Sequence, residues 1–122
     1  MASHVLLIED EPNIAEAIRF ILSRDGWQVS TLGDGLGAVE RVRAERPDLV
    51  ILDLMLPGCS GLEVVEAIRA DPEMGATPVL MLTAKGQGRD REAAVRAGVN
   101  RFMTKPFSNG DMLASVRALV AR

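Results

Sequence analysis

Residues 48–58 read DLVILDLMLPG and contain the most informative residue of the chain, Asp53. The apolar run from Leu49 to Leu52 is typical of a buried strand. Asp53 follows the run directly, so the strand would carry one carboxylate into the loop at its end. The stretch therefore indicates a buried strand that ends at a chemically reactive group.

Three other apolar runs also end at polar or charged residues. The runs and the residues that follow them are Val5 to Ile8 with Glu9-Asp10, Val79 to Leu82 with Thr83, and Phe102 to Thr104 with Lys105-Pro106. In an open parallel sheet, ligands bind in the crevice outside the carboxyl ends of the strands. We therefore expect these side chains to meet in one site.

Helical periods alternate with the strands along the whole chain. They are centred on residues 14–22, 38–42, 62–68, 85–97 and 112–120, and a weaker strand is expected at 27–32. This alternation predicts βαβ units around a parallel sheet, with no internal linker. Ser108 or Asn109 is expected to cap the last helix. The fourth helix is the least apolar, with only Ala93, Ala94, Val95 and Ala97 to bury, so we expect a short, loosely docked helix whose charged residues mostly face solvent.

Length and composition limit the class of protein. The 122 residues suit one domain, 1–122, and 48% of them are hydrophobic, which argues against disorder. A net charge of −3 argues against direct binding of nucleic acid or an anionic membrane, so we expect a protein partner. Cys59 is the only cysteine, so no disulfide can form within the chain, and a reducing compartment fits best. The apolar runs are too short to span a bilayer. With four residues before the first strand, we see no room for a signal peptide and expect a cytoplasmic protein.

The predicted site holds an excess of negative charge. Glu9, Asp10 and Asp53 would lie near one another, and two unit charges about 4 Å apart repel by roughly 4 kcal/mol at an effective dielectric of 20. Lys105 can offset one charge, and a divalent cation with oxygen ligands can offset more. Mg²⁺ is the preferred ion, because it binds one or two carboxylates and keeps its other positions for water and phosphate oxygens.

These residue types are suited to phosphoryl transfer. A carboxylate beside Mg²⁺ and a lysine can attack phosphorus to give an aspartyl phosphate, while the two cations neutralise the transferring oxygens. The Thr83 hydroxyl could donate to a phosphoryl oxygen. The small Ala84 and Gly86 would leave room for backbone N–H donors.

The chain resembles the receiver domains of two-component response regulators, of the chemotaxis-regulator kind. The resemblance is carried by VLLIEDEP at 5–12, DLVILDLMLPG at 48–58, LTA at 82–84 and FMTKPF at 102–107. It implies a flavodoxin-like, doubly wound α/β fold with a five-stranded parallel sheet of order 2-1-3-4-5 and five flanking helices. It also implies that Asp53 accepts a phosphoryl group from a phosphohistidine on a sensor histidine kinase or histidine phosphotransfer protein.

The resemblance also implies a role for each site residue. Asp10 and Asp53 would bind Mg²⁺ directly, Glu9 through water and Met55 through its backbone carbonyl. Lys105 and the Thr83-Ala84 pair would bind the phosphoryl group, Thr83 and Phe102 would form a conformational switch, and Lys105-Pro106 would be a cis peptide.

Three other functions are compatible with an aspartate at a strand end. A phosphatase of the haloacid-dehalogenase type needs a second aspartate where this chain has Met55. A flavodoxin-like flavin protein needs a neutral phosphate loop where this chain has Glu9-Asp10-Glu11. A receiver-like module that binds a partner without being phosphorylated is the third, although such modules typically lack a key residue and none is missing here.

The output surface follows from the resemblance alone. It implies signalling to a downstream protein through the fourth helix, fifth strand and fifth helix. Receivers that dimerise for DNA binding typically carry acids before the switch aromatic, where this chain has Asn100 and Arg101. We therefore expect a single-domain regulator or a receiver of another architecture. A kinase would dock on the first helix, around Asn13, Ile14 and Ala17, and on Pro106-Phe107.

Overall fold

Five strands and five helices alternate along the chain, as the sequence predicts. The structure is a computed structural model that describes residues 3–84 and 88–120, with Arg89 described by its backbone only. The elements are β1 (His4–Ile8), α1 (Pro12–Arg24), β2 (Gln28–Leu32), α2 (Ala38–Glu45), β3 (Leu49–Asp53), α3 (Gly61–Ala70), β4 (Val79–Thr83), α4 (Gly88–Ala97), β5 (Arg101–Thr104) and α5 (Asn109–Leu119).

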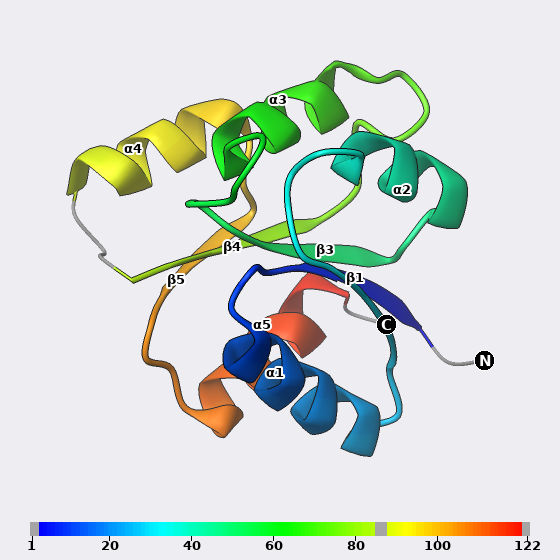
Figure 1. The fold of residues 1–122 in the computed structure, drawn as a ribbon, viewed down its shortest axis with the longest axis vertical. Coiled ribbons are helices and arrows are strands. Elements are labelled where there is room, and N and C mark those ends of the chain that lie inside the picture. Colours follow the sequence, from blue (N-terminus) through cyan, green and yellow to red (C-terminus); the bar gives the residue numbers. More distant parts are fainter. Residues whose placement is uncertain (1–2, 85–87, 121–122) are drawn as a thin grey trace.

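The strands form one parallel sheet of order β2-β1-β3-β4-β5, which confirms the predicted fold class and strand order. Helices α1 and α5 cover one face, and α2, α3 and α4 cover the other (Figure 1). The register pairs Ile8 with Leu52 and Asp53 with Leu82, so β1, β3 and β4 end at nearly the same level. This alignment brings their carboxyl-terminal loops together.

The central strand β3 supplies side chains to both faces of the sheet. Val50 and Leu52 pack in the core beneath α2, α3 and α4, whereas Leu49 and Ile51 pack in the core beneath α1 and α5. All four are fully buried. Successive side chains of a strand point to opposite faces, and burying each aliphatic side chain contributes about 1.5–3 kcal/mol. A continuous apolar run is therefore required here, and β3 carries Asp53 on a rigid support.

Two local predictions need correction. Strand β2 begins at Gln28, one residue later than expected. Trp27 is instead buried, and its indole N–H donates to Asp25 at 2.9 Å. In α4, Ala94 is buried but Val95 is 65% exposed, so the prediction that Val95 is buried is wrong. Because Val95 directly follows Ala94, the helix turns its side chain about 100° away from the buried position.

The predicted cap of α5 falls on one of the two candidates. Ser108 is the N-cap residue, and its side chain accepts a hydrogen bond from the backbone N–H of Asp111 at 3.0 Å. Asn109 is the first helical residue. Helix α5 is therefore capped by a serine, one of the residue types most strongly preferred at the N-cap position.

A half-buried arginine of α3 ties three segments together at the opposite end of the sheet from Asp53. Arg69 donates to the carbonyl oxygens of Gly98, Gly75 and Thr77 at 2.9, 3.0 and 2.7 Å. It also donates to the side-chain oxygen of Asn100 at 2.8 Å. Burial lowers the pKa of this guanidinium, but an arginine remains charged. Arg69 thus fastens the end of α3 to the loop that follows α4.

Replacing Arg69 by methionine is expected to lower the free energy of unfolding by at least about 1.5–3 kcal/mol, the net value of one hydrogen bond to a charged group. The reason is that several carbonyl acceptors lose their donor at once. Urea unfolding followed by Trp27 fluorescence measures the change. Arg96→Met, at an exposed position of α4, is the matched control. Equal unfolding midpoints for the two variants would contradict the assigned role.

Candidate functional site

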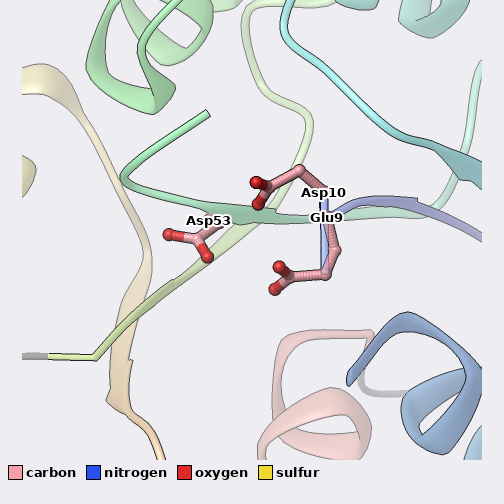
Figure 2. Close-up of side chains that lie close together, drawn as sticks. All are labelled: Glu9, Asp10 and Asp53. Atoms are coloured by element: carbon pink, nitrogen blue, oxygen red, sulfur yellow. The ribbon is translucent and has the colours of Figure 1, made fainter. Parts of the chain in front are cut away.

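Three carboxylates meet at the carboxyl-terminal edge of the sheet. Glu9 and Asp10 follow β1, and Asp53 is the last residue of β3. One oxygen from each lies within 4.8 Å of the others, and Figure 2 shows the three side chains gathered at this edge. Glu9 and Asp53 are only 4% and 6% exposed, whereas Asp10 is exposed. The predicted acidic cluster is therefore present, with one member open to solvent.

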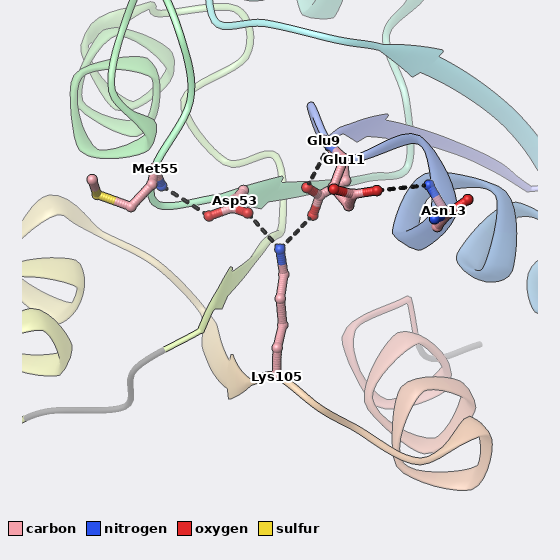
Figure 3. A network of polar contacts seen from close by, with 6 residues as sticks. All are labelled: Glu9, Glu11, Asn13, Asp53, Met55 and Lys105. Atoms are coloured by element: carbon pink, nitrogen blue, oxygen red, sulfur yellow. Dashed lines mark hydrogen bonds and ion pairs between the residues drawn. The ribbon is translucent and has the colours of Figure 1, made fainter.

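Lys105 reaches across the cluster from the end of β5. Its ammonium lies 2.5 Å from Asp53 Oδ2 and 2.8 Å from Glu9 Oε1 (Figure 3). Only 13% of its side chain is exposed. The backbone N–H of Lys105 donates to the Thr83 carbonyl at 2.7 Å, and the Lys105–Pro106 peptide is cis. The hydrogen bond between the Lys105 backbone and the Thr83 carbonyl thus ties the loop after β5 to the end of β4.

The electrostatics of Glu9 and Lys105 depend on each other. Burial raises the pKa of Glu9, and the charge of Asp53 adds to this, while Lys105 and the backbone N–H of Glu11 oppose it. Burial by itself would lower the pKa of Lys105, but its bonds to Asp53 and Glu9 outweigh burial and raise that pKa. The lysine is therefore protonated at neutral pH. Its positive charge offsets only part of the cost of burying an ionised Glu9 carboxylate.

Backbone N–H groups fix the orientation of both buried carboxylates. Met55 donates to Asp53 Oδ1 at 2.8 Å, and Glu11 donates to Glu9 Oε2 at 3.1 Å. Figure 3 shows both contacts flanking the lysine. The Met55 side chain itself is 74% exposed. In each loop, the backbone N–H two residues after the carboxylate therefore holds that carboxylate in place.

Gly61, the first residue of α3, approaches the Asp53 backbone too closely for any side chain. A Cβ at Gly61 would lie 3.0 Å from the Leu54 Cα atom and closer still to the Asp53 carbonyl oxygen. Gly61 closes the sequence PGCSG at 57–61, whose residue types are typical of a turn. The structure shows that it is required for the docking of α3 against the site.

An open pocket of about 330 Å³ lies beside Asp53. Its lining residues are Asp53, Leu54, Met55, Thr83, Ala84 and Asp90. Thr83 is buried at the end of β4, and Ala84 is exposed. Asp90, in the first turn of α4, is half-buried and lines this pocket. Gly86, expected to help bind phosphate, lies outside the described residues.

Phe102 lies on β5, away from the carboxylates. It is half-buried, it packs against the core beneath α2, α3 and α4, and the Arg91 guanidinium lies 5.0 Å from the centre of its ring. It pairs in register with Met81, whereas Thr83 pairs with Thr104. The two expected switch residues therefore lie on adjacent strands, two register positions apart.

The charge of the site suits a hard cation. Three carboxylates and one ammonium leave two negative charges when all four groups are ionised. The Glu9 side chain is fully buried, and burial raises its pKa, so a further positive charge beside it would stabilise its ionised form. Oxygen donors of this kind are the ligands that Mg²⁺ prefers. The described residues thus fit a divalent cation at the cluster of Glu9, Asp10 and Asp53.

Comparison with known proteins identifies a family and several relatives. The family model described as Response regulator receiver domain matches residues 5–117. A Mycobacterium tuberculosis protein named Probable transcriptional regulatory protein TcrX is 44% identical over 118 residues, which are 97% of this chain and 50% of TcrX. The chain spans about half the length of the curated relatives it matches.

Solved structures share the whole fold. A putative response regulator from Chloroflexus aurantiacus has a TM-score of 0.95 and 30% identity, with both chains covered completely. The receiver domain of the sensor histidine kinase PA1611 from Pseudomonas aeruginosa has a TM-score of 0.92 and 29% identity over 100% of both chains, and it holds a magnesium ion in its active-site cleft. No helix in the described part of this chain has the length and apolar composition of a membrane span.

Proposed function

Because this chain belongs to the family of response regulator receiver domains, we propose that Asp53 accepts a phosphoryl group from a phosphohistidine on a partner protein. A receiver domain is a phospho-acceptor signalling module and not a turnover enzyme. The observation that carries the assignment to Asp53 is its position, buried between the Lys105 ammonium and an open pocket. We take residues 1–122 as one receiver domain.

We assign Mg²⁺ to the acidic cluster. Asp10 and Asp53 would bind it directly, Glu9 through water and Met55 through its backbone carbonyl. The excess negative charge of the cluster supports this assignment, and so does the magnesium ion in the PA1611 receiver domain. When bound, the ion neutralises charge on the transferring phosphoryl oxygens.

The chain's own residues have distinct parts in the transfer. A carboxylate oxygen of Asp53 forms a bond to phosphorus, while the bond from phosphorus to the partner's histidine nitrogen breaks and leaves its electron pair on that nitrogen. Lys105 lies next to Asp53 and would bind the phosphoryl oxygens as they arrive. The hydroxyl of Thr83 and the backbone N–H of Ala84, both beside the pocket, would donate to the same oxygens.

We further propose that Thr83 and Phe102 read out phosphorylation. Thr83 would move toward the phosphoryl group, and Phe102 would turn inward behind it, which changes the surface formed by α4, β5 and α5. Phe102 has no hydroxyl, so the change is transmitted by packing. The downstream partner of this surface would be a protein in the cytoplasm. The net charge of −3 argues against direct nucleic-acid binding.

A kinase or phosphotransfer protein would dock beside the site. An apolar groove of about 530 Å³ runs between α1 and the loop after β5, and it is lined by Asn13, Ile14, Ala17, Ile21, Ala84, Lys105, Pro106, Phe107 and Asn109. Ala84 and Lys105 belong to both the groove and the surroundings of Asp53. A helix laid in this groove would therefore bring a phosphohistidine close to the acceptor.

Replacing the exposed Ala17 by glutamate is expected to slow transfer from a phosphorylated histidine kinase by roughly tenfold or more, because a charge would be buried in an apolar contact. Modification by acetyl phosphate, which needs no docking, should be unchanged. Phe20→Glu is the matched control, since Phe20 is 59% exposed on the same helix and does not line the groove. Normal transfer to the Ala17→Glu variant would exclude this docking surface.

Intact mass after incubation with acetyl phosphate tests the proposed function. With Mg²⁺ present, the protein is expected to gain one phosphoryl group, and EDTA should prevent the gain. A chain that takes up no phosphoryl group from acetyl phosphate or from a phosphorylated kinase would instead be a receiver-like binding module, the main alternative.

A further inference from the structure

Asp90 is a charged group in the acceptor pocket that phosphoryl acceptance does not explain. It lies in the first turn of α4 and lines the pocket of about 330 Å³ together with Asp53 and Thr83. Among the described lining residues, Asp53 and Asp90 are the only ones with an acidic or basic side chain. A second carboxylate on the wall of the pocket repels a phosphoryl group that enters it, so the acid lowers rather than raises the affinity for that group.

The position of Asp90 in its helix accounts for only part of this arrangement. An acid in the first turn stabilises a helix by interacting with the positive end of its dipole. That role requires no contact with the pocket, and an exposed side chain would serve it equally well. The lining position therefore indicates a task within the pocket itself.

We propose that Asp90 positions the water that hydrolyses the aspartyl phosphate, and thereby limits the lifetime of the phosphorylated state. The proposal rests on the proposed function of Asp53. Attack on phosphorus requires a water opposite the departing Asp53 oxygen. Lys105 and Glu9 occupy one flank of Asp53, whereas the pocket leaves open space beside it. A carboxylate on the wall of that space can accept a hydrogen bond from the water.

The step balances without any further reactant. The water oxygen forms a bond to phosphorus, and the bond from phosphorus to the Asp53 oxygen breaks, with its electron pair returning to the carboxylate. One proton of the water stays on the phosphate that is released. The other proton passes along the hydrogen bond to Asp90 and from there to solvent. Asp53 is thus restored for a new cycle.

The lifetime of the phosphoryl group tests this role. The protein is phosphorylated with acetyl phosphate and Mg²⁺, the donor is removed, and intact mass follows the loss of the group. Asp90→Asn is expected to lengthen the lifetime by roughly tenfold, equivalent to about 1.4 kcal/mol in the hydrolysis barrier. Asp90→Glu, which retains the carboxylate, should restore much of the native rate.

Glu92→Gln is the matched control, because it removes the same charge from an exposed position of the same helix that does not line the pocket. Its phosphoryl lifetime should equal that of the native protein. Equal lifetimes in the native and Asp90→Asn proteins would overturn the proposal, as would a Glu variant as slow as the Asn variant. A native protein that takes up no phosphoryl group would overturn the acceptor function of Asp53 together with this inference.

Discussion

Replacing Asp53 by asparagine is expected to abolish the Mg²⁺-dependent gain of a phosphoryl group. An amide oxygen carries no negative charge, so it neither attacks phosphorus nor binds a divalent cation as a carboxylate does. Removal of a nucleophile affects the transition state directly, and the loss should be complete within the detection limit of intact-mass measurement. The same variant should receive no phosphoryl group from a phosphorylated histidine kinase.

The fold of the Asp53→Asn variant should remain intact, because Lys105 keeps its ion pair with Glu9 at 2.8 Å. The variant also removes one of three mutually repelling carboxylates. Its unfolding midpoint in urea is therefore expected to equal or exceed that of the native protein. Asp48→Asn, just before the other end of β3, is the matched control and should be phosphorylated normally. An equal phosphoryl gain in the Asp53→Asn variant would rule out this acceptor.

The second large effect concerns Lys105. Lys105→Met is expected to lower the free energy of unfolding at neutral pH by up to about 3–5 kcal/mol, the usual cost of removing one partner of a buried ion pair. Two buried carboxylates lose their cation at once, and the Glu9 side chain is fully buried. Added Mg²⁺ should recover part of the loss, because it supplies positive charge to the same oxygens. Urea unfolding with and without Mg²⁺ measures both effects.

The pH dependence of this loss has a definite sign. Burial raises the pKa of Glu9 above its ordinary value of 4.5, so the folded state favours protonated Glu9. Its contribution to stability is present below pH 4.5 and is lost as pH rises through the raised pKa. Lys105 opposes the rise in the pKa of Glu9, so removing Lys105 raises that pKa further. The stability difference between the native protein and Lys105→Met should therefore shrink as pH falls toward 4.5.

Two further variants separate charge from packing at Lys105. Lys105→Arg keeps the charge and should retain most of the stability. Adding Glu9→Gln to Lys105→Met removes the uncompensated carboxylate and should recover part of the loss. If the double variant were no more stable than Lys105→Met, the cost would come from lost packing of the lysine stem rather than from charge.

The site residues on strand ends could be predicted because each follows an apolar run that the sequence makes plain. Glu9, Asp53 and Thr83 come directly after runs of buried residues, and parallel strands place such positions at one edge. Lys105 follows a shorter run, Phe102 to Thr104, and the same rule places it at this edge. The roles of the individual site residues come from the resemblance to receiver domains. Strand order likewise came from the resemblance, since alternation of elements alone fits several orders.

Other features depend on tertiary packing and have no local signature. The sequence of a charged helix does not show which of its acids lies at a pocket, so the place of Asp90 beside Asp53 has no signal in the sequence. Val95 is apolar but lies outside the narrow stripe through which α4 is buried. Gly61 is indistinguishable in sequence from an ordinary turn glycine, because its close approach to Asp53 arises only when α3 docks. Arg69 finds its acceptors in segments distant along the chain.

The most direct test is to locate the phosphoryl group on the chain. After phosphorylation by acetyl phosphate with Mg²⁺, borohydride reduction converts an aspartyl phosphate to homoserine, which peptide mass spectrometry assigns to a position. Homoserine is expected at position 53 and at no other aspartate. Homoserine at Asp10, or none at any position in a protein that carries the phosphoryl group, would contradict it.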